Sequence, residues 1–414
     1  MAYLSMGRRF LFLVAFFITG DIMSEKTLHL KKMLEEMKER GETWELLRLF
    51  GPSTHRVVVE GKEAVMLASN NYLDLANDPR LKEAAKEAIE KYGWGAGSDW
   101  SIAGYTDLQE KLHKKIAEFK ETAAGLAFQT GFATNAGTLA KIVGKGDVVV
   151  SDELNHGSII DGIRLSRADK VIYKHLDMGD LEDKLRQVHD KYEHILVVTD
   201  GVFSMDGDIA PMDEIVKLAD EYGAMTYVDD SHGEGVLGEG RGIGHHFGVQ
   251  KKIDFQMGTF SKALGSMGGM LAGEEYVIEY VYNTARTWLL SAAYPPAVTA
   301  ANIKSLEIVM QEKDRVQRLW DNRNYFKKEL ESLGFDTWKS QTPIVPVMVR
   351  DSKKAKDLAH MLFEDGVFAL PIVFPMVPRG LERIRNQVSA GHTKEDLDYA
   401  LNAYERAGKK LGLI

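Results

Sequence analysis

The stretch that decides the fold is residues 195–228, ILVVTDGVFSMDGDIAPMDEIVKLADEYGAMTYV. Residues 195–199 form a short apolar run rich in β-branched side chains, which predicts a buried strand. Residues 212–222 carry apolar side chains at helical spacing and end before Gly223, so they predict a helix. Residues 225–228 predict a second strand. This order indicates a parallel strand pair joined by a crossover helix.

The same alternation extends from this unit in both directions. Apolar strand-like runs occur at 124–128, 148–150, 170–174 and 255–257, and helical patterns at 133–143, 156–166 and 180–192. Together they predict an α/β fold, with a mostly parallel sheet flanked by helices. Sheets of this kind bind ligands at the carboxyl ends of their strands, so we expect the functional residues there.

The pattern changes after Pro295 and Pro296. A long helical stretch is expected over 297–333, a strand at 345–349, and helices at 353–365 and 394–411. These elements predict a smaller α+β C-terminal domain. The expected organisation is an extension at 1–22, a helix and arm at 23–66, a large domain at 67–296 and a small domain at 297–414.

The composition restricts the class of protein. The 414 residues include 52 Lys+Arg and 61 Asp+Glu, a net charge of −9, with 44% hydrophobic and 27% charged residues. These values exclude a disordered chain, a collagen-like fibre and a polytopic membrane protein. The acidic balance argues against nucleic-acid binding. Cysteine is absent, which excludes disulfides and thiolate chemistry and fits a cytoplasmic location.

The N-terminus resembles a targeting signal in part. Arg8 and Arg9 precede an apolar run at 10–18, as in the first two regions of a signal peptide. The run is shorter than the roughly 20 residues that span a bilayer, and no clear cleavage site follows. Met23 opens an amphipathic helix pattern. We expect residues 1–22 to be an upstream extension, with an export signal or a peripheral anchor as the alternatives.

A single lysine lies in the Gly-rich segment 258–265, GTFSKALG. The amine of Lys262 is nucleophilic only when neutral, and burial or a nearby cation lowers its pKa. Glycines around it let a planar ring approach the backbone, and Thr259 could donate to a phosphate. The alternative is a solvated loop lysine. This segment alone leaves both interpretations open.

A second candidate segment is 228–233, VDDSHG. A buried Asp229 can keep a pyridinium nitrogen protonated, and His232 can bond a phenolic oxygen. Asp229, Asp230 and His232 could instead ligate a metal, but further ligands would be needed elsewhere. Residues 233–238 also match the Gly-x-Gly-x-x-Gly dinucleotide fingerprint. We reject that match because a loop, not a helix, is expected to follow.

Two turns carry further candidates. Gly131 and Phe132 begin an expected helix, whose first N–H groups can bind an anion such as phosphate. An ordinary strand-to-helix turn is the alternative. His156 could stack on an aromatic ring or cap a helix, and Asp152 and Asn155 fit helix capping equally well.

Two arginines occur together in the small domain. Arg383 and Arg385 are two residues apart in a strand-like segment, so alternation places them on the same face. The planar guanidinium can bind a substrate carboxylate through two hydrogen bonds. An exposed surface strand is the alternative.

Together these segments resemble the fold-type I enzymes that use pyridoxal 5′-phosphate (PLP), and among them the α-oxoamine synthases, over residues 69–413. The most specific matches are ASNNYL at 68–73, SDELNHGSIIDG at 151–162, SMDGD at 204–208 and GTFSKALG at 258–265. Each motif alone is weak, whereas their order and spacing are specific. VPRG at 377–380 and RIRNQVSAGHT at 383–393 most resemble glycine C-acetyltransferase, whose sister family is 8-amino-7-oxononanoate synthase.

The resemblance implies roles around the cofactor ring. Lys262 would bind PLP covalently and later remove a proton from the substrate Cα. Asp229 would keep the pyridine nitrogen protonated, His232 would bond the ring oxygen, and His156 would stack on the ring. Ser204, within the 204–208 match, is also expected to bind the cofactor.

The resemblance also implies a phosphate site and a substrate site. The phosphate would be held by Gly131, Phe132 and Thr259, and by Ser291 of a neighbouring subunit, so a homodimer is expected. The substrate carboxylate would meet Asn70 and Arg385.

The reaction implied is the condensation of an amino acid, glycine, with an acyl-CoA, acetyl-CoA, and release of CoA. The alternatives are 8-amino-7-oxononanoate synthase, which joins alanine to pimeloyl-CoA, or another fold-type I enzyme such as an aminotransferase. A catalytically silent subunit is disfavoured because Lys262, Asp229, His232 and His156 are all present. No metal, nucleic acid or membrane is expected among the partners.

Two positions depart from the family pattern. Trp100 stands where the family usually has arginine, and Asp74 replaces glycine in the usual Asn-Tyr-Leu-Gly. Because both lie near the family's substrate site, the acyl chain stays open.

Overall fold

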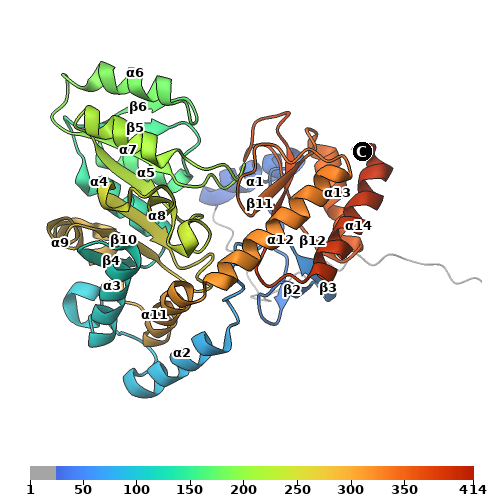
Figure 1. Ribbon diagram of the computed structural model, residues 1–414, viewed down its shortest axis with the longest axis horizontal. Helices are drawn as coiled ribbons and strands as arrows, with labels where there is room; N and C mark the ends of the chain where they lie inside the picture. The colour runs from blue at the N-terminus through green and yellow to red at the C-terminus, as the bar shows by residue number, and fades with distance from the viewer. Residues whose placement is uncertain (1–24) are drawn as a thin grey trace, which may run out of the picture. The chain divides into compact units, whose positions relative to one another are not determined.

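The computed structural model describes residues 25–414 of the chain, and its largest element is a seven-stranded sheet (Figure 1). The strand order is β4-β10-β9-β8-β7-β5-β6. The strands are β4 (Ala124–Phe128), β5 (Val148–Asp152), β6 (Asp169–Tyr173), β7 (Ile195–Asp200), β8 (Met225–Asp229), β9 (Phe255–Thr259) and β10 (Gly269–Gly273). Strands β6, β5, β7, β8 and β9 pair in parallel, whereas β10 is antiparallel to β4 and β9. The predicted α/β fold with a mostly parallel sheet is confirmed.

Helices flank this sheet (Figure 1). They include α3 (Asp107–Lys120), α4 (Gly131–Ile142), α5 (Gly157–Ser166), α6 (Met178–Val188), α7 (Met212–Glu221), α8 (Ile243–Phe247), α9 (Glu275–Thr284) and α10 (Arg286–Leu289). Helix α2 (Pro79–Tyr92) packs on α11 (Pro296–Gln311) instead. Every residue of β5 and β7 is buried, as continuous β-branched runs require when both faces of a strand are covered.

A second, three-stranded antiparallel sheet has the order β11-β14-β13. Its strands are β11 (Ile344–Met348), β13 (Leu370–Ile372) and β14 (Arg383–Gln387), and it shares a separate apolar core with α13 (Ser352–Glu364) and α14 (Lys394–Leu411). The bounds of α14 agree with the sequence prediction. Thr393 caps its first turn by accepting from Asp396 N, and Gly412 ends it in the left-handed conformation.

The predicted single helix over 297–333 is wrong. The structure has two helices, α11 (Pro296–Gln311) and α12 (Lys313–Ser332). Glu312 separates them with φ −100° and ψ 65°, outside the helical region. Its carboxylate accepts a hydrogen bond from Arg315 Nε at 2.8 Å and another from Arg80, so ion pairs fix the break without proline or glycine.

The N-terminal part contributes a four-stranded sheet, β1-β2-β3-β12. Its strands are β1 (Leu49–Phe50), β2 (Arg56–Val59), β3 (Lys62–Met66) and β12 (Val367–Phe368). Helix α1 (Leu28–Glu39) belongs to a separate compact unit that ends at Leu46. The extension expected at 1–22, with its apolar run, lies outside the described residues. From residue 25 onward, no helix has the length and apolar character needed to cross a membrane.

Candidate active site

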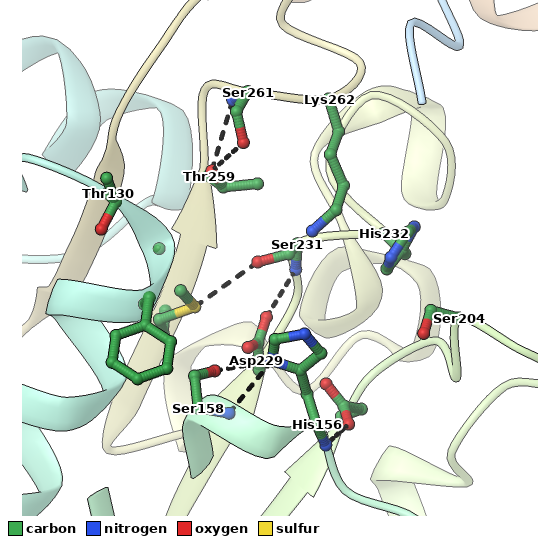
Figure 2. A pocket seen from close by; sticks show the side chains of 14 residues that line it. Thr130, His156, Ser158, Ser204, Asp229, Ser231, His232, Thr259, Ser261 and Lys262 are labelled. Carbon is green, nitrogen blue, oxygen red and sulfur yellow. Dashed lines mark hydrogen bonds between the residues drawn. The ribbon is translucent and has the colours of Figure 1, made fainter. Parts of the chain in front are cut away.

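A cavity of about 210 Å³ lies at the carboxyl ends of β7, β8 and β9 (Figure 2). It brings together most of the residues that the sequence singled out: Gly131, Phe132, His156, Ser204, Asp229, His232, Thr259 and Lys262. Asn70, Ser291 and Arg385 do not line it. Asp200, Ser158, Ser231 and Ser261 line it too, although no role was predicted for them from the sequence.

Lys262 follows β9, and its side chain reaches toward Asp229 and Ser231 (Figure 2). Burial lowers the pKa of its amine, although the charges of Asp229 and Asp200 oppose the shift. No side chain among the described residues holds the ammonium in a hydrogen bond or ion pair. The amine is therefore available as a nucleophile or base.

The carboxylate of Asp229 is fixed at the end of β8 and is 4% exposed. Oδ2 accepts from Asn135 Nδ2 at 2.7 Å, and Oδ1 accepts from Ser231 N at 3.0 Å. Asn135 is itself oriented, because its Oδ1 accepts from Tyr227 Oη at 2.8 Å and its Nδ2 donates to Ser158 Oγ at 2.9 Å. This network holds one buried carboxylate toward the cavity.

Asp200 ends β7 and is the register partner of Asp229 across the parallel pair. Its Oδ2 accepts from His156 N at 2.7 Å. Burial raises the pKa of Asp200 well above its usual value, and the Asp229 charge adds to the shift. Protonation of Asp200 therefore relieves the repulsion between two adjacent carboxylates.

His156 caps a helix, which is one of the two functions that the sequence left open, and it also lines the cavity. Its Nδ1 accepts from Ser158 N at 3.3 Å, which caps α5, and its ring lines the cavity (Figure 2). Burial lowers the pKa of His156. The ring is thus a neutral, flat surface suited to stacking on an aromatic cofactor.

The expectation that Asp152 and Asn155 cap this helix is wrong. The Asp152 carboxylate accepts from Leu154 N at 2.8 Å and bonds His175 Nδ1 at 3.0 Å. Asn155 Nδ2 donates to Val198 O at 2.8 Å and so ties the turn to β7. Each side chain thus bonds a residue that is distant in the sequence, and spacing within the motif cannot reveal such a partner.

His232 Nδ1 lies 2.8 Å from Tyr72 Oη. Burial lowers the pKa of His232 well below its usual value and raises the pKa of Tyr72 to about 12, so both side chains are neutral at pH 7. With the phenol as donor, Nε2 carries the ring proton. His232 can then donate to an oxygen placed in the cavity.

The first turn of α4 borders the cavity. Thr130 caps it, since its Oγ1 accepts from Ala133 N at 3.0 Å. The N–H groups of Gly131 and Phe132 precede the first intrahelical bonds and can bind an anion. A Cβ on Gly131 would lie 3.1 Å from Met257 Cε. A larger residue at this position would therefore reduce the space in the cavity.

Thr259 does not offer a free proton to a phosphate, which corrects the sequence expectation. Its Oγ1 donates to Gly268 O at 2.6 Å and lies 2.8 Å from Ser261 Oγ. The Thr259 proton is therefore used within the protein. The Ser261 hydroxyl, which lines the cavity, must then be the donor to Thr259 Oγ1 and would have to give up that bond to meet a phosphate.

Asp230 points away from Asp229 into a buried charge cluster. Lys120 Nζ lies 3.1 Å from Asp230 Oδ2 and 2.7 Å from Glu234 Oε1, and all three side chains are at most 2% exposed. Glu234 also accepts from Thr259 N at 2.9 Å, and burial raises its pKa to about 7. Asp229 and His232 thus line the cavity, whereas Asp230 belongs to the buried charge cluster. Over residues 25–414, no group of three or more His, Asp or Glu side chains is placed to hold a metal ion.

Arg385 and Asn70 form a pair beside the cavity. Arg385 Nη2 donates to Asn70 Oδ1 at 3.0 Å, while its Nε is buried without a partner. Burial lowers the pKa of Lys262 and of His232, and the Arg385 charge lowers both further. The guanidinium is therefore close enough to act on the cavity and retains an unused donor. Arg383, on the same strand, bonds Met205 O and Asp206 instead.

Ser291 and Trp100 are both directed elsewhere within the chain. Ser291 Oγ donates to Thr287 O at 2.7 Å, just after α10. Trp100 is 1% exposed and stacks on Trp288 with a ring separation of 5.7 Å, with Tyr294 edge-on at 5.2 Å. The Trp100 ring is therefore packed in the apolar core of the chain, and its effect on the acyl chain stays a prediction.

Asp74 adopts φ +53°, in the left-handed region that favours glycine. Its Oδ2 lies 2.7 Å from His55 Nδ1. A Cβ on Gly391 would lie 2.2 Å from the same oxygen, so glycine at 391 leaves the space that the carboxylate occupies. The strained backbone of Asp74 is thus offset by a local ion pair.

Comparisons with known proteins agree with this site. Residues 62–403 match the family described as aminotransferase class I and II. The chain is 54% identical over 386 residues to 8-amino-7-oxononanoate synthase of Thermoanaerobacter pseudethanolicus, covering 93% of this chain and 98% of the relative. It is 51% identical over 382 residues to the enzyme of the same name from Symbiobacterium thermophilum, covering 92% and 97%.

Solved structures are similar over nearly the whole chain. Sphingomonas wittichii serine palmitoyltransferase has a TM-score of 0.89 at 30% identity, covering 95% of this chain and 100% of that one. A structure of SPT with a PLP internal aldimine gives the same values. An 8-amino-7-oxononanoate synthase from Francisella tularensis has a TM-score of 0.72 at 25% identity, covering 85% and 99%.

The residues present fit PLP. The cavity offers a fixed carboxylate for a ring nitrogen at Asp229, a flat neutral ring at His156 and an unpaired amine at Lys262. The free N–H groups at the start of α4 suit a phosphate. With the match over residues 62–403, this donor set shows that the chain belongs to the aminotransferase class I and II family, as a PLP-dependent α-oxoamine synthase.

Proposed function

We propose that the protein is an 8-amino-7-oxononanoate synthase, which joins alanine to pimeloyl-CoA and releases CoA and CO2. The observation that carries this is the combination of the Lys262–Asp229–His156 cavity with 54% identity to a synthase of that name over 93% of the chain. The glycine and acetyl-CoA reaction favoured by the sequence gains no support from the comparisons, in which the relatives at 48–54% identity carry the synthase name.

Bound PLP supplies an electron sink for the carbanion formed at the amino acid Cα. The Asp229 carboxylate would hold the proton on the pyridine nitrogen, and the His232 Nε2–H would bond the ring oxygen. The His156 ring would stack on the cofactor. The N–H groups of Gly131 and Phe132 would bind the phosphate. Ser204 lines the cavity and adds a further hydroxyl.

The free amine of Lys262 removes the proton from the substrate Cα. The Cα–H bond must be oriented for that transfer, and a carboxylate held by a planar guanidinium supplies the orientation. Arg385 has this capacity because its Nε lacks a partner and its neighbour Asn70 offers a second polar contact. We expect the small domain to move when substrate binds, which would keep water away from the reacting Cα.

The homodimer is part of the proposal. Large apolar side chains are exposed at Trp94 (74%), Ile102 (77%) and Leu290 (73%), more than an isolated surface favours. Ser291 follows Leu290, so a partner that covers this region would bring that serine to an interface. Ser291 of one subunit would then complete the phosphate site of the other.

The test is a matrix of substrates with the PLP-loaded protein. Alanine, glycine and serine are each combined with acetyl-, pimeloyl- and palmitoyl-CoA, and released CoA is measured with a thiol reagent. The chain contains no cysteine, so protein thiols contribute no background. We expect kcat/KM to be highest for alanine with pimeloyl-CoA. A higher value for glycine with acetyl-CoA, or for serine with palmitoyl-CoA, would refute this assignment within the same reaction class.

A further inference from the structure

The loop at 203–209, which follows β7, is hydrogen-bonded both to β14 and to the residues that precede β11. It closes on itself through Gly207 N to Phe203 O at 2.8 Å and Phe203 N to Asp208 O at 3.1 Å. Ser204 projects from it into the cavity (Figure 2). Whatever fixes this loop therefore fixes Ser204.

Arg383, on β14, forms hydrogen bonds with one side of the loop. Its Nη1 donates to Met205 O at 2.9 Å and to Asp206 Oδ1 at 2.5 Å, and its Nε donates to Leu381 O at 2.9 Å. The side chain is 1% exposed. A buried guanidinium with three acceptors has a defined geometry, which a flexible surface pair lacks.

Gln341 and Thr342, which precede β11, form hydrogen bonds with the backbone of the same loop. Gly207 O accepts from Gln341 N at 2.9 Å and from Thr342 Oγ1 at 3.0 Å. Gly207 has φ +77°, and a Cβ there would lie 2.5 Å from Ile344 O. Only glycine allows the two sheets to approach this closely at the loop.

The opposite side of the loop is tied to the large sheet. His175 Nε2 bonds Asp208 Oδ2 at 2.9 Å, and His175 Nδ1 bonds Asp152 Oδ1 at 3.0 Å. Asp152 ends β5, which pairs in parallel with β6 on one side and β7 on the other. The loop is thus clamped between a fixed strand end on one side and β14 on the other.

We propose that Arg383 and Asp206 are a positioning pair that ties β14, and with it Arg385, to the loop that carries Ser204. Arg383 and Arg385 lie two residues apart on the same face of one strand, so they move together. A carboxylate bound at Arg385 therefore acts through Arg383 on the loop and on the cofactor end of the cavity. This inference rests on the proposed function, which places the substrate carboxylate at Arg385.

The experiment compares Asp206→Asn with the wild-type holoenzyme. Asparagine keeps the side-chain shape but removes the charge that Arg383 binds. Three quantities are measured: the alanine dissociation constant, from the absorbance change of the bound cofactor; the KM for pimeloyl-CoA; and the retention of PLP. We expect the alanine constant to rise about tenfold, with PLP retention and the pimeloyl-CoA KM changed far less.

Asp336→Asn is the matched control. It breaks the Arg350–Asp336 pair, also 2.5 Å long, which is about half exposed and makes no contact with the loop. An alanine constant for Asp206→Asn equal to that of this control would overturn the proposal. Equal losses in alanine, pimeloyl-CoA and PLP binding would overturn it as well, because they indicate a generally loosened fold.

Two further variants distinguish failure of the coupling from failure of the proposed function. If Asp206→Asn does not fold, Arg383→Lys replaces it, because lysine keeps the buried charge paired but cannot reach both Met205 O and Asp206. Arg385→Lys tests the proposed function separately. Weaker alanine binding in Arg385→Lys with wild-type binding in Asp206→Asn overturns the coupling alone. Unchanged alanine binding in Arg385→Lys overturns the carboxylate assignment.

Discussion

Asn135 Nδ2 donates to Asp229 Oδ2 at 2.7 Å and so joins the helix that begins at the anion site to the carboxylate at the far end of the cavity. Gly131 and Phe132 open that helix, and Asn135 lies one turn further on. A single rigid element therefore sets the spacing between the proposed phosphate site and the proposed pyridine-nitrogen site.

Replacement of Asp229 by asparagine should remove most activity and leave the fold intact. An amide cannot hold a proton on the pyridine nitrogen, so the ring becomes a poor electron sink. We expect kcat to fall by about a hundredfold or more, while circular dichroism and the unfolding midpoint change little. Turnover close to the wild-type rate would contradict the role given to this carboxylate.

Lys262 should be the only lysine that borohydride links to PLP. Its buried amine has a lowered pKa and no competing ion pair, which makes it the nucleophile of the cavity. Reduction followed by peptide mapping should place the label within 258–265. Lys262→Ala should give no labelled peptide and no turnover, and a label elsewhere would disprove the assignment.

Arg385→Lys should raise the KM for the amino acid by at least about tenfold, because lysine keeps the charge but loses the planar pair of donors. The KM for the acyl-CoA should move much less. Steady-state kinetics with one substrate varied at a time measures both values. Equal effects on the two constants would show that this guanidinium does not select the carboxylate.

The stability of the protein should fall at alkaline pH because of His175. Burial opposes protonation, but the hydrogen bonds that His175 donates to the Asp152 and Asp208 carboxylates raise the pKa of His175 to about 9. Since this value lies above the unfolded value of about 6.5, the stabilisation is complete below about pH 6.5 and is lost as pH rises through about 9. It amounts to about 3 kcal/mol.

Urea unfolding of the holoenzyme at about pH 6.5 and at about pH 9.5 measures this loss. His175→Gln is the comparison, since glutamine cannot titrate. The variant should be less stable at the lower pH and show a flatter pH dependence. A slope equal to that of the wild type would assign the alkaline loss to other groups.

The active protein should be a dimer with its sites at the subunit junction. Sedimentation at assay concentration should give two chains per particle. Lys262→Ala and Ser291→Asp should each be inactive alone, the second because a carboxylate repels the phosphate. Mixed dimers should regain activity, because one of their two sites carries neither change. An active monomer, or no recovery on mixing, would contradict this arrangement.

The sequence predicted those strands and helices whose hydrophobic pattern and capping residues match the way they are packed in the folded protein. The β-branched runs of β5 and β7 are buried on both faces, and α14 has a capping threonine and a terminal glycine. β10 was missed because Gly-Met-Leu-Ala-Gly has little strand propensity. Its small residues are required by packing, since a Cβ on Gly269 would lie 2.1 Å from Thr134 Oγ1.

The sequence identified site residues whose side-chain chemistry stands out within a motif. It missed residues that matter only because the fold places them beside the cavity. Lys262, Asp229 and His156 were visible in their motifs. Asn135 and Asp200 are ordinary polar residues whose importance comes from register and helix packing. The burial of Trp100 was not predicted, because its stacking on Trp288 depends on a residue far along the chain.

The antiparallel insertion of β10 has a consequence for how the chain folds. Within the main sheet β4 pairs with β10 alone, and β10 also separates β4 from β9. β4 ends at Phe128, whereas its partner begins at Gly269. During synthesis β4 therefore has no partner strand until β10 has left the ribosome, and the large separation of the two strands along the chain makes this pairing slow. The helix that opens at Gly131 directly follows β4, so the anion end of the cavity is completed late in folding.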